Sequence, residues 1–293
     1  MSDYRTSRAG PWHDLTDNIV GGEIQFGNTV TFLSEVDLTE VEAIRKRAAR
    51  TMRPTYTAFV AKAVALALRE YPYANRRLYR RSWLPWGRHR IQEFGDCDLA
   101  VACERNLPGV HVATFIDIMR SADRLTLTEI TEWLRNLASS DEHNNAQWRT
   151  YKWIVTNLPA WLAALIVRLP VFSPSMWAKY RGGSVIISSP AKYGIDTIVG
   201  AWTAPLGISF GYAKMRAVVR EKEVVPRKTF ALTLNFDRRV MAGAQAARFF
   251  KRIVELLESA ASSLTEQTPA APDAVQGNRI ESRLNRCLQA VGD

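Results

Sequence analysis

The stretch Phe236-Asp237-Arg238-Arg239-Val240-Met241-Ala242-Gly243-Ala244 decides the fold. Apolar residues alternate ahead of it, so Phe230–Phe236 is predicted to be a buried strand. The charged residues Asp237, Arg238 and Arg239 follow, and apolar residues then recur at helical spacing over Gly243–Ser262. The stretch therefore predicts a strand that is followed by a long amphipathic helix.

Helices and strands alternate along the chain on the N-terminal side of this stretch. Thr39 and Glu42 have the spacing of a capping box and open a predicted helix. Prolines 54 and 72 enclose an apolar run, Tyr56–Glu70, that is predicted to be a second helix. Because strands and helices intermingle and no internal repeat occurs, we expect a two-layer α/β sandwich. The other predicted strands are Glu23–Leu38, Leu99–Ala102, Val110–Ile118, Ser184–Ser189 and Leu206–Ala213, and the other predicted helices are Thr39–Met52 and Thr126–Ala138.

Composition divides the chain into three parts. Residues 1–22 are polar and aromatic without periodicity and are interpreted as an N-terminal arm. Residues 23–264 form the predicted domain. Residues 265–293 hold prolines among small and polar residues and then apolar residues at helical spacing, which predicts a linker and a short C-terminal helix.

The chain carries a formal net charge of +10, with arginines clustered between Arg76 and Arg90. Such a cluster is compatible with a solvated face, with phosphate or coenzyme binding, or with nucleic acid. No nucleic-acid-binding signature accompanies it, so nucleic acid is not expected as a partner. The three cysteines are widely spaced, which favours neither a disulfide framework nor a metal site, and we expect a reducing cytoplasm.

The segment Trp153–Val167 is apolar and uncharged, and Lys152 and Arg168 flank it. It is shorter than the ~20 residues that a membrane-spanning helix needs. We interpret it as a buried or interfacial helical hairpin. Contact with a membrane surface or a partner protein is the alternative.

Three segments, taken together and in this order, resemble one family. They are the helix Tyr56–Leu68 with Pro72 and Asn75 after it, the run from Leu99–Ala102 through Gly109-Val110 to Ala122–Leu127, and the stretch 236–244 with Ala247-Arg248-Phe249. The last resembles the active-site motif F-D-H-R-V-x-D-G-A of the acyltransferase catalytic domains of 2-oxoacid dehydrogenase complexes. Over residues 23–264 the chain is therefore similar to this family, whose fold is like that of chloramphenicol acetyltransferase.

The resemblance implies a homotrimer with active sites in channels between subunits. Coenzyme A or an acyl-CoA would bind as substrate, an acyl carrier or other acceptor would enter from the opposite side, and no metal is implied. In the family the motif histidine is the general base and the aspartate four residues later helps to position the site. A strand serine donates a hydrogen bond to the oxyanion, and Ser188 matches its position here.

The sequence departs from the family at the reacting groups. Arg238 stands where the family has its histidine, and Ala242 stands where it has the aspartate. Arginine stays protonated at usable pH and cannot act as a general base. His111, in the predicted strand after Pro108-Gly109, is the candidate for a replacement base, although a lone strand histidine more often has a structural role. No lipoyl-bearing segment is recognised in the sequence.

Three functions remain open from the sequence. The first is acyl transfer with modified chemistry, in which Arg238 acts by its charge on a thiolate or an oxyanion and the acceptor is already nucleophilic. A biosynthetic transfer to a small acceptor would fit this chemistry. The second is a catalytically inactive, trimeric scaffold that holds a ligand or partner. The third is binding to an anionic surface through the arginine cluster and the apolar segment.

Overall fold

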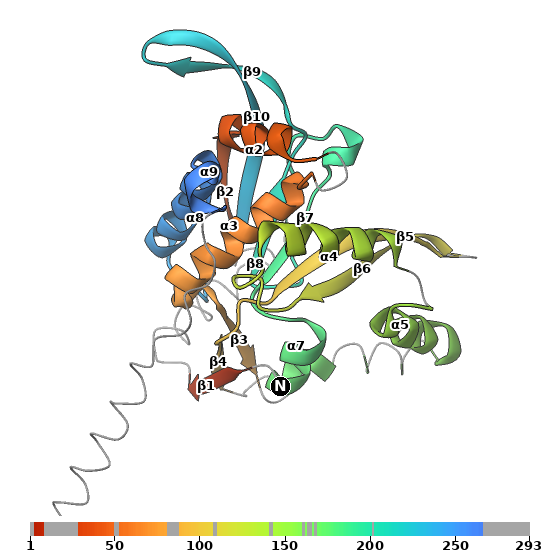
Figure 1. Cartoon of the computed structure of the whole chain (residues 1–293). Helices are drawn as coiled ribbons and strands as arrows, with labels where there is room; N and C mark the ends of the chain where they lie inside the picture. The colour runs from red at the N-terminus through yellow and green to blue at the C-terminus, as the bar shows by residue number, and fades with distance from the viewer. Residues whose placement is uncertain are drawn as a thin grey trace, which may run out of the picture.

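A computed structural model describes residues 3–8, 29–49, 53–80, 88–107, 110–140, 143–159, 162, 166, 169–200 and 202–265. Its main element is a mixed sheet (Figure 1). The strands follow the order β2-β10-β8-β7-β5-β6, and β9 pairs with the free part of β10. The neighbours β5, β7 and β8 run parallel, and the other pairs are antiparallel. The strand bounds are β2 Thr29–Asp37, β5 Leu99–Leu107, β6 Val110–Met119, β7 Val185–Ser188, β8 Leu206–Phe210, β9 Lys214–Arg220 and β10 Glu223–Asp237.

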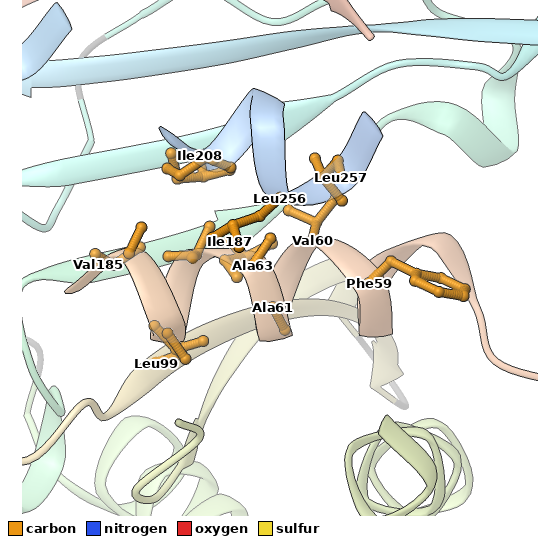
Figure 2. Packing of buried hydrophobic residues seen from close by; sticks show 14 of the residues in the cluster. Phe59, Val60, Ala61, Ala63, Leu99, Val185, Ile187, Ile208, Leu256 and Leu257 are labelled. Carbon is orange, nitrogen blue, oxygen red and sulfur yellow. The ribbon is translucent and has the colours of Figure 1, made fainter. Parts of the chain in front are cut away.

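The helices α3 (Tyr56–Glu70), α4 (Leu127–Ser139) and α8 (Gly243–Glu258) share one apolar core with the sheet. Every residue of α3 from Ala58 to Leu68 is buried, because this helix lies between the strands and its neighbouring helices (Figure 2). The alanines on α3 let the helix approach the strands closely, while Phe59 fills the space at one end. Removing one such buried aromatic side chain costs about 3–5 kcal/mol. These layers confirm the expected α/β class.

The predicted helices agree with the structure except at their ends. Tyr56–Glu70 has the predicted bounds, and Thr55 caps it by accepting from the amide of Ala58 at 3.1 Å. The predicted helix Thr39–Met52 is shorter, since α2 spans Thr39–Arg47. The predicted helix Gly243–Ser262 is split into α8 and α9, which spans Ala260–Ser263.

The expected capping box at Thr39 and Glu42 is wrong. Thr39 donates its hydroxyl to the Asp37 carboxylate at 2.6 Å, and α2 has no side-chain cap. Glu42 instead accepts hydrogen bonds from Tyr56 and Arg45, at 2.6 and 2.7 Å. A complete capping box is present at α4, where Thr126 and Glu129 bond reciprocally.

A second sheet of three strands lies outside the main sheet, in the order β1-β4-β3. Its strands are β1 Tyr4–Arg8, β3 Arg76–Arg80 and β4 His89–Phe94. Residues 4–8, interpreted from sequence as part of an arm, therefore form a strand along β4. Residues 9–28 and 266–293, which include the rest of that arm and the predicted C-terminal helix, lie outside the described residues.

The antiparallel strands β9 and β10 form a long hairpin that extends away from the sheet (Figure 1). The hairpin turns at Glu221 and Lys222, whose φ angles of 48° and 71° are typical of a tight two-residue turn. Exposed apolar side chains lie along it, including Met215, Val219 and Val224.

The segment between the two halves of the sheet holds α5 (Ala146–Asn157) and α7 (Pro174–Tyr180). Of the apolar segment 153–167, the structure describes residues 153–159, 162 and 166, and residues 153–157 belong to α5. None of the helices that the structure describes has the length and apolar character that a bilayer crossing requires.

Candidate active site

Arg238 lies in the turn between β10 and α8, where the sequence placed it. Its side chain is exposed, and among the described residues it makes no hydrogen bond or ion pair. A guanidinium in this state keeps its charge and all its donors for a ligand.

The turn around Arg238 is held by two other arginines. Asp237 accepts from Arg239, whose Nε lies 3.0 Å from Oδ1 and whose second terminal nitrogen lies 2.8 Å from Oδ2. Arg76 from β3 donates to the carbonyl oxygen of Val240 at 3.0 and 2.6 Å. Burial lowers the pKa of Arg76, although the nearby Glu93 opposes this shift. The backbone of the turn is therefore fixed on both sides of Arg238, while the guanidinium of Arg238 has no hydrogen-bond partner among the described residues.

Ala242 is the N-cap residue of α8, and it offers no side-chain acceptor to the first turn. Gln245 supplies one half of a capping arrangement, because its Oε1 accepts from the Ala242 amide at 3.1 Å. The aspartate that the family has here would be a strong N-cap residue. Alanine at this position leaves the first turn of α8 without a side-chain cap.

Ser188 is the last residue of β7 and is half-buried. Its side chain is on the sheet face opposite α3, since Ile187 points into the core. The hydroxyl has no hydrogen-bond partner within the part of the chain that the structure describes. The neighbouring Ser189 is engaged, because it donates to the Phe210 carbonyl at 2.7 Å.

Strand register separates Ser188 from Arg238 within one chain. Ser188 pairs with Ser209 on β8, and Ser209 pairs with Thr233 on β10, five residues before Arg238. The backbone positions of Ser188 and Arg238 are thus separated by two strands across the sheet and by more than four residues along the strands. At about 3.3 Å per residue and about 4.8 Å per strand, they lie at least about 16 Å apart.

His111 lies near the tip of the β5–β6 hairpin, at the end of the sheet opposite Arg238. Its backbone belongs to β6, and its side chain lies outside the described residues. Ser188 sits between the other two candidates along the strand direction. A single chain therefore does not bring Arg238, Ser188 and His111 together.

The outer sheet face beside Ser188 carries buried polar groups that sequence reasoning missed. Ser209 and Asn235 are almost fully buried, and within the described part of the chain each has a side-chain atom without a hydrogen-bond partner, Oγ of Ser209 and Nδ2 of Asn235. Thr31 donates to Oδ1 of Asn235 at 2.6 Å. Trp202 lies directly on Gly207, where any side chain would collide with its ring. Polar residues at alternating positions of Phe230–Phe236 were the available signal.

Other chemistries find little support among the described residues. Within them, no group of acidic, histidine or cysteine side chains could hold a metal ion. Burial raises the pKa of the Cys97 thiol to about 12, so this cysteine is not a ready nucleophile.

Comparison with protein families gives one match, to the model described as "2-oxoacid dehydrogenases acyltransferase (catalytic domain)", over residues 26–158 and 177–265. Residues 159–176 are left out of this match. A curated relative is the dihydrolipoyllysine-residue acetyltransferase component of the pyruvate dehydrogenase complex of Bacillus subtilis. It is 25% identical over 242 residues, which are 78% of this chain and 44% of that protein. The chain thus spans about half the length of the curated relatives it matches.

Solved structures with the same fold include an Azotobacter vinelandii dihydrolipoamide acetyltransferase, studied for the roles of a serine, a histidine and an asparagine in its catalytic mechanism. It has a TM-score of 0.56 and 22% identity, covering 80% of this chain and 84% of that one. A chloramphenicol acetyltransferase has a TM-score of 0.50 and 14% identity, covering 86% of this chain and 100% of that one. The fold is therefore that of the chloramphenicol-acetyltransferase-like domains.

Proposed function

We propose a function for this chain, which belongs to the family of 2-oxoacid dehydrogenase acyltransferase catalytic domains. It transfers the acyl group of an acyl-CoA to an acceptor that needs no general base. The observation that carries the proposal is the state of Arg238. Its neighbours Arg76 and Arg239 hold the turn in place, and Arg238 alone of the three is exposed and unpaired among the described residues. A side chain that only filled a dead site would not need so fixed a support.

The chemistry follows from a permanent positive charge. A nucleophilic acceptor, such as a free amine or a thiolate, attacks the thioester carbonyl carbon, and the coenzyme A thiolate leaves. Negative charge develops first on the carbonyl oxygen and then on the departing sulfur. A guanidinium beside either atom stabilises that charge, and donors of this kind are worth about 2.7–4 kcal/mol in enzymes. The proton lost by an amine passes to the thiolate or to water.

The distance between Arg238 and Ser188 supports a site that is shared between two copies of the chain. Each copy offers Arg238 at one end of its sheet and Ser188, with its uncommitted hydroxyl, toward the other. We propose a homotrimer in which Arg238 of one copy faces Ser188 of the next, as the family resemblance implies. His111, the candidate replacement base from the sequence, lies on β6 at the end of the sheet away from Arg238.

Calorimetric titration with acetyl-CoA tests the role of Arg238. We expect Arg238→Ala to weaken binding about ten- to hundredfold, the value of a lost hydrogen bond to a charged group. Arg248→Ala is the matched control, because Arg248 is also an exposed arginine without a partner among the described residues, one turn into α8. If Arg238→Ala leaves both acetyl-CoA binding and acyl transfer to amines unchanged, the transfer proposal fails.

Subunit mixing tests the shared site. Ser188→Ala and Arg238→Ala chains should each transfer poorly, yet trimers refolded from both should regain activity, since some channels then combine an intact Ser188 with an intact Arg238. Light scattering should report a mass near three times 33.0 kDa. A monomer at micromolar concentration would contradict the shared site.

A catalytically inactive scaffold is the second candidate. Both polar positions of the family motif are replaced, and Ala242 offers no functional group at all. This candidate predicts the trimer without acyl-CoA binding, so the same calorimetric titration separates the two.

A further inference from the structure

The region from position 143 to position 195 has an unusual composition. Residues 143–195 contain no aspartate or glutamate, whereas six lysines and arginines and four of the nine tryptophans of the chain fall within them. The match to the family passes over residues 159–176 in the middle of this region. The family match therefore covers both ends of this region and leaves out its middle.

Large apolar side chains of this region are exposed. Trp153 on α5 is 56% exposed, and Val171 and Phe172, just before α7, are 42% and 37% exposed. Leu169 and Tyr180 add 40% and 41%. We call these five exposed residues, which lie between positions 153 and 180 of the sequence, the apolar patch.

Part of the patch is held rigidly to the protein. Arg77 on β3 is buried, stacks on the ring of Trp177 at 4.1 Å, and donates to the carbonyl oxygen of Val171 at 3.1 Å. Gln92 on β4, also buried, accepts from Arg77 at 2.8 Å and donates to the Pro174 carbonyl at 3.0 Å. The backbone of residues 171–174 is thus fixed by buried side chains, while the side chains of Val171 and Phe172 are left in solvent.

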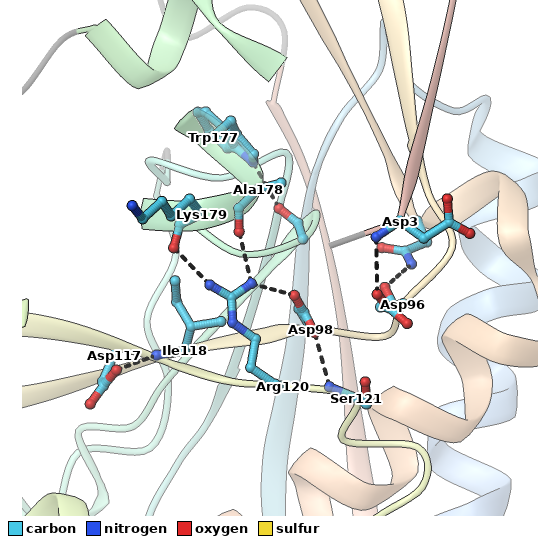
Figure 3. Close-up of polar contacts among 12 residues, drawn as sticks. Asp3, Asp96, Asp98, Asp117, Ile118, Arg120, Ser121, Trp177, Ala178 and Lys179 are labelled. Carbon is cyan, nitrogen blue, oxygen red and sulfur yellow. Dashed lines mark hydrogen bonds and ion pairs between the residues drawn. The ribbon is translucent and has the colours of Figure 1, made fainter. Parts of the chain in front are cut away.

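The other end of α7 is fixed as well (Figure 3). Arg120 donates to the carbonyl oxygens of Ala178 and Lys179, both at 2.7 Å, and pairs with Asp98 at 2.5 Å. A cation at these carbonyls also complements the C-terminal end of the helix. Because both ends of the segment 171–179 are anchored, the exposure of its apolar side chains is a built feature of the surface.

Cations accompany the patch. Arg149 on α5 and Lys179 on α7 are exposed, and neither forms an ion pair with a described residue. Lys179 lies over the ring of Tyr180 at 5.1 Å. Tryptophan, phenylalanine and leucine beside lysine and arginine, with no acidic residue among them, are the composition of segments that lie in the interface of a membrane.

We propose that the apolar patch and its cations bind the surface of an anionic lipid membrane, with the side chains of Trp153 and Phe172 in the headgroup region. Charge complementarity decides the kind of surface, since acid-free basic segments are attracted to anionic lipids. The rings of the patch could also stack on nucleic-acid bases, but Leu169 and Val171 add aliphatic surface that a lipid interface can bury and a base cannot use for stacking. This inference is independent of the acyl transfer proposed above.

Vesicle co-sedimentation of the full chain tests the proposal. The protein should sediment with vesicles of equimolar phosphatidylcholine and phosphatidylglycerol, and much less with phosphatidylcholine alone. Raising the salt concentration should weaken the binding, because it screens exposed charges. Trp153→Ser with Phe172→Ser should lower the partition coefficient at least about tenfold, since each ring loses an apolar environment. Arg149→Gln with Lys179→Gln should lower it about fivefold per cation.

The matched control is Val219→Ser with Val224→Ser. These two residues face each other on the β9–β10 hairpin and are 68% and 70% exposed, but they lie outside the acid-free region. Their replacement should leave vesicle binding unchanged. The proposal is overturned if wild-type protein does not sediment with the anionic vesicles at low salt, or if both pairs of patch variants bind as the wild type does. Two further results would overturn it when the wild type does not bind vesicles. One is binding of a single-stranded oligonucleotide by the wild type, and the other is a loss of oligomer mass in the patch variants.

Discussion

Asp237 and Arg239 form a two-point ion pair on either side of Arg238, the residue that the sequence motif places at the family's histidine position. The Nε and a terminal nitrogen of Arg239 reach the two carboxylate oxygens of Asp237, at 3.0 and 2.8 Å. The amide of Arg239 also donates to the same carboxylate at 2.9 Å. These contacts restrain the backbone of the turn at Arg238. The side chain of Arg238 itself makes no hydrogen bond or ion pair among the described residues.

This ion pair gives a first prediction. Asp237→Asn removes the charge that holds Arg239, so the turn loosens and acetyl-CoA affinity should fall severalfold even though Arg238 is intact. The stability cost should be small, about 0.5–1 kcal/mol, since the pair is partly exposed. Isothermal titration and urea unfolding measure the two effects. Arg252→Ala is the control, because Arg252 makes a similar two-point pair with Glu70 away from the turn. Equal loss of affinity in both variants would mean that the turn has no special role.

The uncapped start of α8 gives a second prediction. Ala242→Asp adds an acceptor for the first-turn amides and a negative charge at the positive end of the helix. We expect a gain of about 1 kcal/mol in the free energy of unfolding, or about 2–4 °C in Tm. Ala242→Asn should give a similar gain, because capping does not require the charge. Thermal unfolding of both variants checks this, and an unchanged or lower Tm would show that Gln245 already satisfies the helix end.

A third prediction concerns the free energy of unfolding at acid pH. Burial acts most strongly on Glu42 and would raise the pKa of its carboxyl, but hydrogen bonds from Tyr56 and Arg45 and the charge of Lys228 outweigh it, so the pKa lies below its ordinary value of 4.5. A lowered folded-state pKa means that the stabilisation is present above the unfolded-state pKa and is lost as the pH falls through the folded-state pKa. Glu42→Gln should therefore cost about 1 kcal/mol at pH 7, and the difference from wild type should close below the ordinary pKa.

Urea unfolding at a series of pH values measures this difference. Glu132→Gln is the control, since Glu132 is exposed and has no partner among the described residues. Its difference from wild type should stay near zero at every pH. A Glu42→Gln cost that persists in acid would trace the effect to the packing of α2 and not to the charge of Glu42.

The sequence predicted elements well where apolar periodicity and prolines agree. Tyr56–Glu70 is the best case, because Pro54 and Pro72 enclose a run whose apolar residues meet the core on almost every side. It missed β3, where Arg76–Arg80 contains three arginines and looks solvated. The structure places Arg77 in the interior against Trp177, a contact between residues a hundred positions apart that no local pattern can reveal.

The candidate site shows the same limit. The motif located Arg238 and the strand pattern located Ser188, each at its position in the fold. Their separation depends on the register of β7, β8 and β10, which is set by long-range pairing. The support that Arg76 gives to the turn also depends on tertiary packing, since it joins residues 164 positions apart.

A fourth prediction returns to the chemistry of Arg238. Wild-type protein should show little transfer from acetyl-CoA to dihydrolipoamide, because that acceptor needs a base and losing one costs about 10²–10⁴-fold. Arg238→His with Ala242→Asp restores the family pattern, and it should gain dihydrolipoamide transfer while transfer to amine acceptors falls, since the fixed positive charge is gone. Arg238→Lys keeps the charge without the planar guanidinium, so retained amine transfer in this variant would assign the effect to charge. Steady-state assays with both acceptors check each outcome. Rapid dihydrolipoamide transfer by the wild type would instead show that another residue supplies the base, and His111→Ala should then abolish it.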